Sequence, residues 1–107
     1  MTTGAELKQL GTELVIESDR QRDNAGEYIA DAIQTLIAAG RDFTAEDVRD
    51  QLRDKPAVLA VMAERPNLLS AHFAGASRSG DIRPVGFTIP ARASRHGSVI
   101  RVWRAAA

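Results

Sequence analysis

The sequence predicts an α+β domain in which helices fill the chain up to Gly80 and a β-hairpin closes it. Two patterns carry the prediction. Apolar residues recur at helical spacing through residue 80, and Val, Ile, Phe and Trp are concentrated in residues 81–90 and 98–104.

The charge follows a similar division. Residues 1–66 hold thirteen acids and eight bases, whereas residues 67–107 hold six Arg, both His and a single Asp. The formal net charge of zero is therefore the sum of an acidic part, residues 1–66, and a basic part, residues 67–107. This arrangement is typical of a protein that presents one basic face to a polyanion.

Composition indicates one ordinary globular domain. The chain has 107 residues, of which 44% are hydrophobic and 26% are charged, enough for a single core. It has no cysteine, so packing alone must hold the fold and we expect a cytoplasmic location. The first ten residues lack the features of a signal peptide, and the longest apolar run, residues 57–63, is too short to span a membrane. We expect neither export nor membrane insertion.

The chain is predicted to begin with a short amphipathic helix. Thr3 and Glu6 have the spacing of a capping box. An apolar stripe follows, made of Leu7, Leu10, Leu14 and Val15. A polar stretch then separates this helix from the rest, so we divide the chain into residues 1–23, a helix with a linker, and residues 24–107, the main domain. A lone helix cannot hide such a stripe, which either forms a homodimer or folds back onto its own domain.

Three helices are expected before residue 66. Asn24 with Glu27 caps the first, which Gly40 ends. Its apolar face consists of Ile29, Ala32, Ile33, Leu36 and Ile37. Residues 41–43 look extended, and Thr44 with Asp47 then opens a helix that carries Val48 and Leu52 inward. Pro56 is placed to begin a further short helix that ends at Glu64.

The helix that follows Pro66 has two distinct faces. Its core face is predicted to carry Leu69, Phe73, Ala76 and Gly80. The opposite face carries Asn67, Ala71, Ala74, Gly75 and Arg78, with Ser70 and Ser79 beside it. Small residues let a helix backbone approach a DNA groove, where Asn67 and Arg78 are able to reach bases or phosphates. Alternatively, they let another helix pack there. His72 flanks the core face and is interpreted as a neutral structural residue.

The two strands alternate apolar residues, so five side chains are predicted to face the core. They are Val85, Phe87, Ile89, Ile100 and Val102. Strict alternation then turns Trp103 outward. Either a bulge returns it to the core, which we favour for the single Trp of a small domain, or it covers the outer face beside Arg83 and Arg101.

The loop between the strands is basic. Arg92, Arg95 and His96 lie within five residues, and Arg83, Arg101 and Arg104 occupy the strands that support them. Such a cluster near a phosphate track supplies salt-sensitive binding. A solvated hairpin loop also accounts for the polarity, but it explains poorly why no acid occurs from Ile82 to the end of the chain.

Helix, short strand, two helices and a hairpin with a basic loop is the order of a winged helix-turn-helix domain. Residues 29–104 resemble winged-helix DNA-binding proteins of actinobacterial phages and their hosts. The resemblance lies in the sequence FTAEDV at residues 43–48, Pro-Asn at residues 66–67, His-Gly at residues 96–97 and Val-Trp at residues 102–103. It implies three or four helices with a C-terminal hairpin wing, preceded here by an extra N-terminal helix. Residues 53–65 depart from the pattern because they exceed the turn of a simple helix-turn-helix.

This resemblance implies a cytoplasmic protein of a bacterium or a phage-infected cell that binds duplex DNA. It would act as a transcriptional regulator or as a phage replication or recombination accessory. The residues expected to contact DNA are Asn67, Ser70, Ala71, Ala74, Arg78, Ser79, Arg83, Arg92, Arg95, His96 and Arg101.

Catalytic signatures are weak. Ser70 and His72 do not face each other on a helix, and two distant His without Cys make no recognisable zinc site. Glu46 and Asp50 alternate with Arg49 and Arg53, as on a solvated ion-pair face. We expect no enzyme activity, metal, cofactor or small-molecule substrate.

The alternative function is a protein-interaction module on the same fold, with residues 7–15 or 57–63 as its contact surface.

Overall fold

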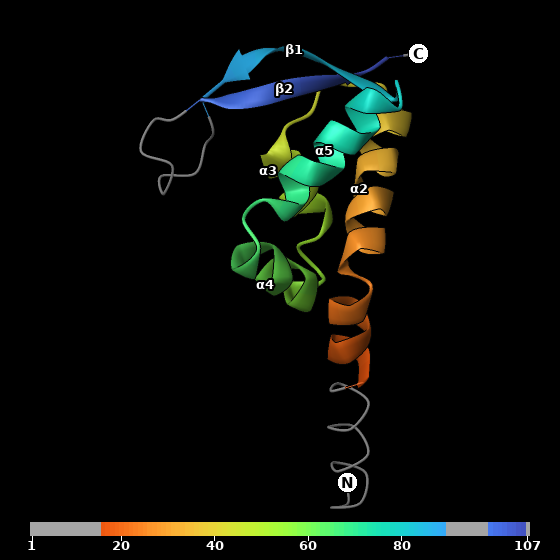
Figure 1. Cartoon of the computed structure of the whole chain (residues 1–107), viewed down its shortest axis with the longest axis vertical. Helices are drawn as coiled ribbons and strands as arrows, with labels where there is room; N and C mark the ends of the chain where they lie inside the picture. Colours follow the sequence, from red (N-terminus) through yellow and green to blue (C-terminus); the bar gives the residue numbers. More distant parts are fainter. Residues whose placement is uncertain (1–15, 90–98, 107) are drawn as a thin grey trace, which may run out of the picture.

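The computed structural model describes residues 16–89 and 99–106 of the chain. Their fold is α+β, as predicted, with five helical segments and one antiparallel hairpin in the described ranges (Figure 1). The elements are the helical residues 16–23, α2 (Ala25–Ala39), α3 (Ala45–Gln51), α4 (Pro56–Glu64), α5 (Leu68–Arg78), β1 (Ile82–Thr88) and β2 (Ile100–Ala105). The hairpin lies across one end of the helices, and α5 runs between α2 on one side and α3 and α4 on the other (Figure 1). None of the helices in the described ranges is long and apolar enough to cross a membrane.

Residues 16–23 and α2 form two helical segments that meet at Asn24. The predicted cap at Asn24 is wrong, because its side chain makes no hydrogen bond to the start of α2. Instead its Nδ2 donates to the carbonyl of Arg20 at 2.9 Å, and its backbone N–H bonds the same oxygen at 3.1 Å. The polar stretch before Asn24 is helical, so Asn24 ends one helix as another begins. At the far end of α2, Gly40 has a φ of 72° and its N–H bonds the carbonyl of Ile37, which confirms the predicted stop.

The predicted start of α3 is confirmed. The Thr44 hydroxyl accepts a hydrogen bond from the N–H of Glu46 at 3.2 Å. In return, the Asp47 carboxylate accepts one from the N–H of Thr44 at 2.8 Å. These bonds satisfy donors that the first turn of a helix leaves without partners. Val48 and Leu52 are buried, as the helical spacing predicted.

Helix α4 begins at Pro56 as predicted and is held by the segment before α2. The buried Gln21 accepts a hydrogen bond from the N–H of Ala57 at 3.2 Å, and Arg22 pairs with Glu64 at 2.9 Å. The apolar run 57–63 was a candidate partner surface, but its larger side chains point into the core. Val58, Val61 and Met62 are all buried, so these three are not available to a partner.

Three aromatic rings form the part of the core beneath the hairpin. Phe73 of α5 stacks on Trp103 of β2, with ring centroids 5.3 Å apart and planes 20° apart. Phe43 lies against the same Phe73 ring at 6.3 Å and is 1% exposed. Phe43 also pairs with Trp103 through the backbone, as an isolated antiparallel bridge beside β2. The extended segment predicted at residues 41–43 therefore lies beside β2 and pairs with it through one isolated bridge.

The hairpin confirms one expectation about its core face and corrects two. Trp103 is buried, as favoured, but not through the predicted bulge: the register shift lies in β1, between Pro84 and Gly86, so Trp103 keeps the alternation of β2 and shares a face with Arg101. Ile100 is buried, while Val85 and Val102 are half-buried. Phe87 and Ile89, both predicted to be core, are 62% and 69% exposed. The reason is tertiary: this half of the hairpin projects past the helices, so no helix lies beneath it to exclude water (Figure 1).

Candidate nucleic-acid interface

Helix α5 turns the predicted face toward the core. Leu69 and Phe73 are buried and Ala76 packs against the core, but Gly80 is exposed, which corrects its assignment to the core face. Gly80 follows the helix with a φ of 81°, so the chain has already left the helical path there. Arg78 is exposed, as the DNA-binding hypothesis requires.

The remaining candidate residues of α5 lie on both sides of the helix. Asn67, Ser70, Ala71 and Ser79 are exposed and Ala74 is half-buried. Asn67 occupies the N-cap position without a capping hydrogen bond from its side chain. These side chains do not form a single surface. Ala71 and Ser79 line one groove, whereas Ser70 and Ala74 line another on the opposite flank of the helix.

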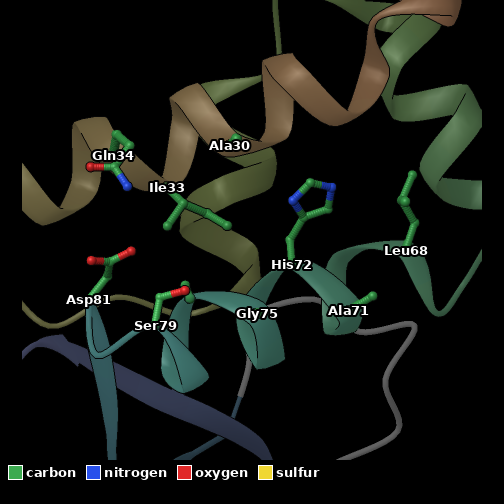
Figure 2. Close-up of a pocket in the computed structure, with 10 residues that line it drawn as sticks. Ala30, Ile33, Gln34, Leu68, Ala71, His72, Gly75, Ser79 and Asp81 are labelled. Carbon is green, nitrogen blue, oxygen red and sulfur yellow. The ribbon is translucent and has the colours of Figure 1, made fainter.

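The groove between α5 and α2 encloses about 360 Å³ and is drawn in Figure 2. His72 reaches across it toward α2, where its Nε2 lies 3.5 Å from the place that a Cβ on Gly26 would occupy. The glycine therefore leaves room for the imidazole to pack against α2. This contact supports the interpretation of His72 as a structural residue. Farther along α5 the flank is open, because a Cβ on Gly75 would meet nothing within 4 Å.

The groove on the other flank is larger, about 610 Å³, and lies between α3, α4, α5 and β2. It brings together Ser70, Ala74 and Arg101, three of the residues predicted to contact DNA. Its lining also includes Arg49 of α3 and contains no carboxylate. Sequence reasoning missed Arg49 by assigning it to a solvated ion-pair face. That pairing exists, with Arg49 Nη1 3.4 Å from Glu46 Oε1, but nothing local in the sequence indicates that Arg49 also borders this groove.

The hairpin places its arginines on two different faces. Arg83 is directly opposite Arg104 in the register, and Arg104 forms two hydrogen bonds with Asp42, of 2.7 and 2.9 Å. The hydrogen bond from Arg104 holds the pKa of the Asp42 carboxyl below its ordinary value, and the charge of Arg83 lowers that pKa further. Neighbouring residues of a strand point to opposite faces, so Arg83 and Arg104 lie on the face of the hairpin away from Trp103.

Arg101 lies on the other face, the one that Trp103 shares. Its guanidinium carbon is 5.7 Å from the centroid of the Trp103 ring and 5.2 Å from that of Phe87. Arg83 and Arg101, predicted as members of one site, are thus separated by the sheet. Only Arg101 borders the groove beside α5.

The basic loop lies outside the described residues. Arg92, Arg95 and His96 were the strongest candidates for phosphate contacts, and they remain predictions. The same holds for the apolar stripe at Leu7 to Val15 and for the homodimer proposed from it.

Four acids of the N-terminal half lie away from the larger groove. Four exposed carboxylates recur every fourth residue along residues 16–23 and α2. They are Asp19, Asp23, Glu27 and Asp31. On α2, Glu27 and Asp31 lie on the side of the helix opposite Ile29 and Ile33, which are in the core. Glu27 and Asp31 therefore face outward from α2, and none of the four carboxylates borders the groove that contains Arg49 and Arg101.

Within the described part of the chain, no group of three His, Asp or Glu side chains is arranged to hold a metal ion. Comparison with protein families, with curated proteins and with solved structures finds no match to this chain. Its functional interpretation therefore depends on its own geometry.

Proposed function

We propose that the chain is a winged-helix module that binds duplex DNA, as part of a transcriptional regulator or of a phage replication or recombination accessory. The observation that carries the proposal is the bridge between Phe43 and Trp103. It pairs the extended segment that precedes α3 with the last strand of the hairpin that follows α5. This pairing fits the order of a winged helix that the sequence predicts, with α5 as its recognition helix.

The grooves and charges beside α5 support this assignment. The helix presents small exposed residues with Arg78 at its C-terminal end, so its backbone is able to approach the floor of a major groove. Arg101 lines the same larger groove as Ser70 and Ala74, and a guanidinium beside a base-reading helix suits the phosphates that flank it. The basic residues of the loop would extend this contact along the DNA backbone.

Helix α4 makes the module different from a simple helix-turn-helix. It occupies the stretch between α3 and α5 that exceeds the usual turn, and it packs by Val58 and Val61 into the common core. Helix α5 nevertheless contacts α2 and leads directly into β1. The insertion therefore leaves the proposed recognition helix in contact with its scaffold.

The proposal is tested by titrating the protein into labelled random-sequence duplex DNA and following anisotropy at two salt concentrations. If four to six phosphates are neutralised, the logarithm of the affinity falls against the logarithm of salt with a slope of about −4 to −5. If folded protein at micromolar concentration does not bind the DNA at about 50 mM salt, the proposal is contradicted.

A second function, protein binding on the same fold, is favoured by one observation. Three large apolar side chains are exposed where the hairpin projects beyond the helices. They are Phe87, Ile89 and Val99, and their exposed fractions are 62%, 69% and 60%. Exposed apolar clusters of this kind mark interaction surfaces. Absence of DNA binding, together with a complex formed through this part of the hairpin, would favour this second function.

A further inference from the structure

A continuous series of flat groups leads from the core to the surface of the hairpin. Phe43 contacts Phe73, Phe73 stacks on Trp103, and the guanidinium of Arg101 lies over Trp103. The same guanidinium lies over the ring of Phe87, 5.2 Å from its centroid. Exposure rises along the series from 1% at Phe43 to 62% at Phe87. The last ring thus lies against a guanidinium that in turn lies over a buried ring, while most of Phe87 contacts water.

This arrangement prepares Arg101 for a negatively charged ligand. A guanidinium that stacks on rings through its faces keeps its N–H donors at its edge, where they suit the oxygens of a phosphate. Stacking also limits the conformations of a long side chain, so less entropy is lost when it binds. Arg101 borders the larger groove, which Arg49 also lines and in which no lining residue is a carboxylate.

Phe87 supplies the complementary part of the site. An exposed aromatic ring beside a cation suits a ligand that joins a flat ring to an anionic group. A nucleotide has both, and bases stack on aromatic side chains with little regard to sequence because each base has a π-face. An apolar peptide would use the ring but leave the guanidinium without an anion. The charge of Arg101 beside the ring therefore favours a nucleotide as the occupant.

We propose that Phe87 and Arg101 form a binding site for one unpaired nucleotide, with the base stacked on Phe87 and its phosphate bound by Arg101. This inference rests on the proposed DNA binding, which it makes more specific. Inside a duplex both faces of a base are covered by its neighbours, so the Phe87 ring is accessible only to an unpaired base at a gap or in a single-stranded extension. The protein would then favour the junction between duplex and single strand over blunt duplex.

The test compares two labelled DNAs, a short blunt duplex and the same duplex with a single-stranded oligothymidine extension. The wild-type protein is expected to bind the extended DNA roughly tenfold more tightly, the preference expected from one base stacked on one ring. Phe87→Ala should abolish this preference and leave the affinity for blunt duplex unchanged. Arg101→Ala should weaken binding to the extended DNA more than binding to the blunt duplex.

Two matched variants separate stacking from apolar contact. Phe87→Tyr keeps an aromatic ring and should keep the preference, whereas Phe87→Leu keeps apolar bulk without the ring and should lose it. All of these variants change exposed side chains, and a urea midpoint equal to that of wild type establishes that each is folded.

Equal wild-type affinity for the two DNAs overturns the nucleotide site while leaving duplex binding intact. Retention of the preference in Phe87→Leu also overturns it. Absence of binding to either DNA by the wild type overturns the proposed function itself, and the nucleotide site with it.

Discussion

Phe43 and Trp103 exchange two backbone hydrogen bonds, although one precedes α3 and the other lies near the end of β2. The N–H of Phe43 donates to the carbonyl of Trp103 at 2.9 Å, and the N–H of Trp103 donates to the carbonyl of Phe43 at 2.8 Å. Both side chains contact Phe73 of α5. This one pair therefore ties the hairpin to the helices and fixes the face of β2 that meets the core.

The buried ring of Phe43 makes it a principal stability residue. Phe43→Ala should lower the free energy of unfolding by about 3–5 kcal/mol, because it removes a ring that is 1% exposed and leaves a cavity. Urea denaturation measures the change. Phe87→Ala is the matched control, since that ring is 62% exposed and its loss should cost no more than about 0.5 kcal/mol. Similar losses for the two variants would contradict the described core.

The segment before α2 is expected to stabilise α4 through Gln21. Gln21→Ala removes the acceptor for the N–H of Ala57, so the free energy of unfolding should fall by roughly 1–2 kcal/mol. Urea denaturation again provides the measurement. Gln34→Ala, on the exposed side of α2, should have little effect. Equal stability of the two variants would show that Gln21 does not hold α4.

Acid should weaken the link between β2 and the strand at Phe43. The folded state lowers the pKa of Asp42 from its ordinary value of 3.8, chiefly through the hydrogen bond from Arg104. The stability that this pair adds is therefore complete above about 3.8 and is lost as the pH falls through the lowered pKa of the folded state. Asp42→Asn should unfold at a lower temperature than wild type at neutral pH and approach it in strong acid. A difference in melting temperature that is constant with pH would refute this.

The two faces of the hairpin predict different roles for its arginines in DNA binding. Arg101→Ala should weaken binding to random duplex DNA and flatten the salt slope by about one unit. Arg104→Ala should change neither, because its guanidinium is bound to Asp42 on the opposite face. Anisotropy titrations at several salt concentrations compare the two. A larger effect at Arg104 would place the DNA on the outer face.

The basic loop and α5 should differ in what they contribute to binding. Arg92→Ala combined with Arg95→Ala should weaken binding to all sequences alike and flatten the salt slope by about two units. Asn67→Ala or Arg78→Ala should instead cost roughly 1–3 kcal/mol at a preferred sequence and little on random DNA. Binding to selected and random duplexes separates the two patterns. If the loop double variant binds DNA as tightly as wild type does, the loop arginines contact solvent and not phosphates.

The elements that were predicted correctly share one property: their signals are local. Thr44 and Asp47 are three residues apart and bond each other's backbone, and Gly40 takes up a left-handed conformation that other residues avoid. Pro56 begins α4 because its missing N–H costs nothing at the first helical position. Asn24 does not cap α2, because the predicted cap requires non-helical residues before it. Residues 16–23 are helical, and the Asn24 side chain bonds the carbonyl of Arg20 instead.

The sequence by itself determined the order of helices and hairpin, the stops at Gly40 and Gly80, and the division between acidic and basic residues, because these depend on neighbours within a few positions. Tertiary structure alone decided which face of β2 brings Trp103 into the core, that Phe87 is left exposed, and that Arg101 joins Ser70 and Ala74 while Arg83 lies on the other face. The physical reason is that alternation along a strand states which residues share a face, but not which face is covered. That choice follows from the pairing of Phe43 with Trp103, which connects segments far apart in the chain.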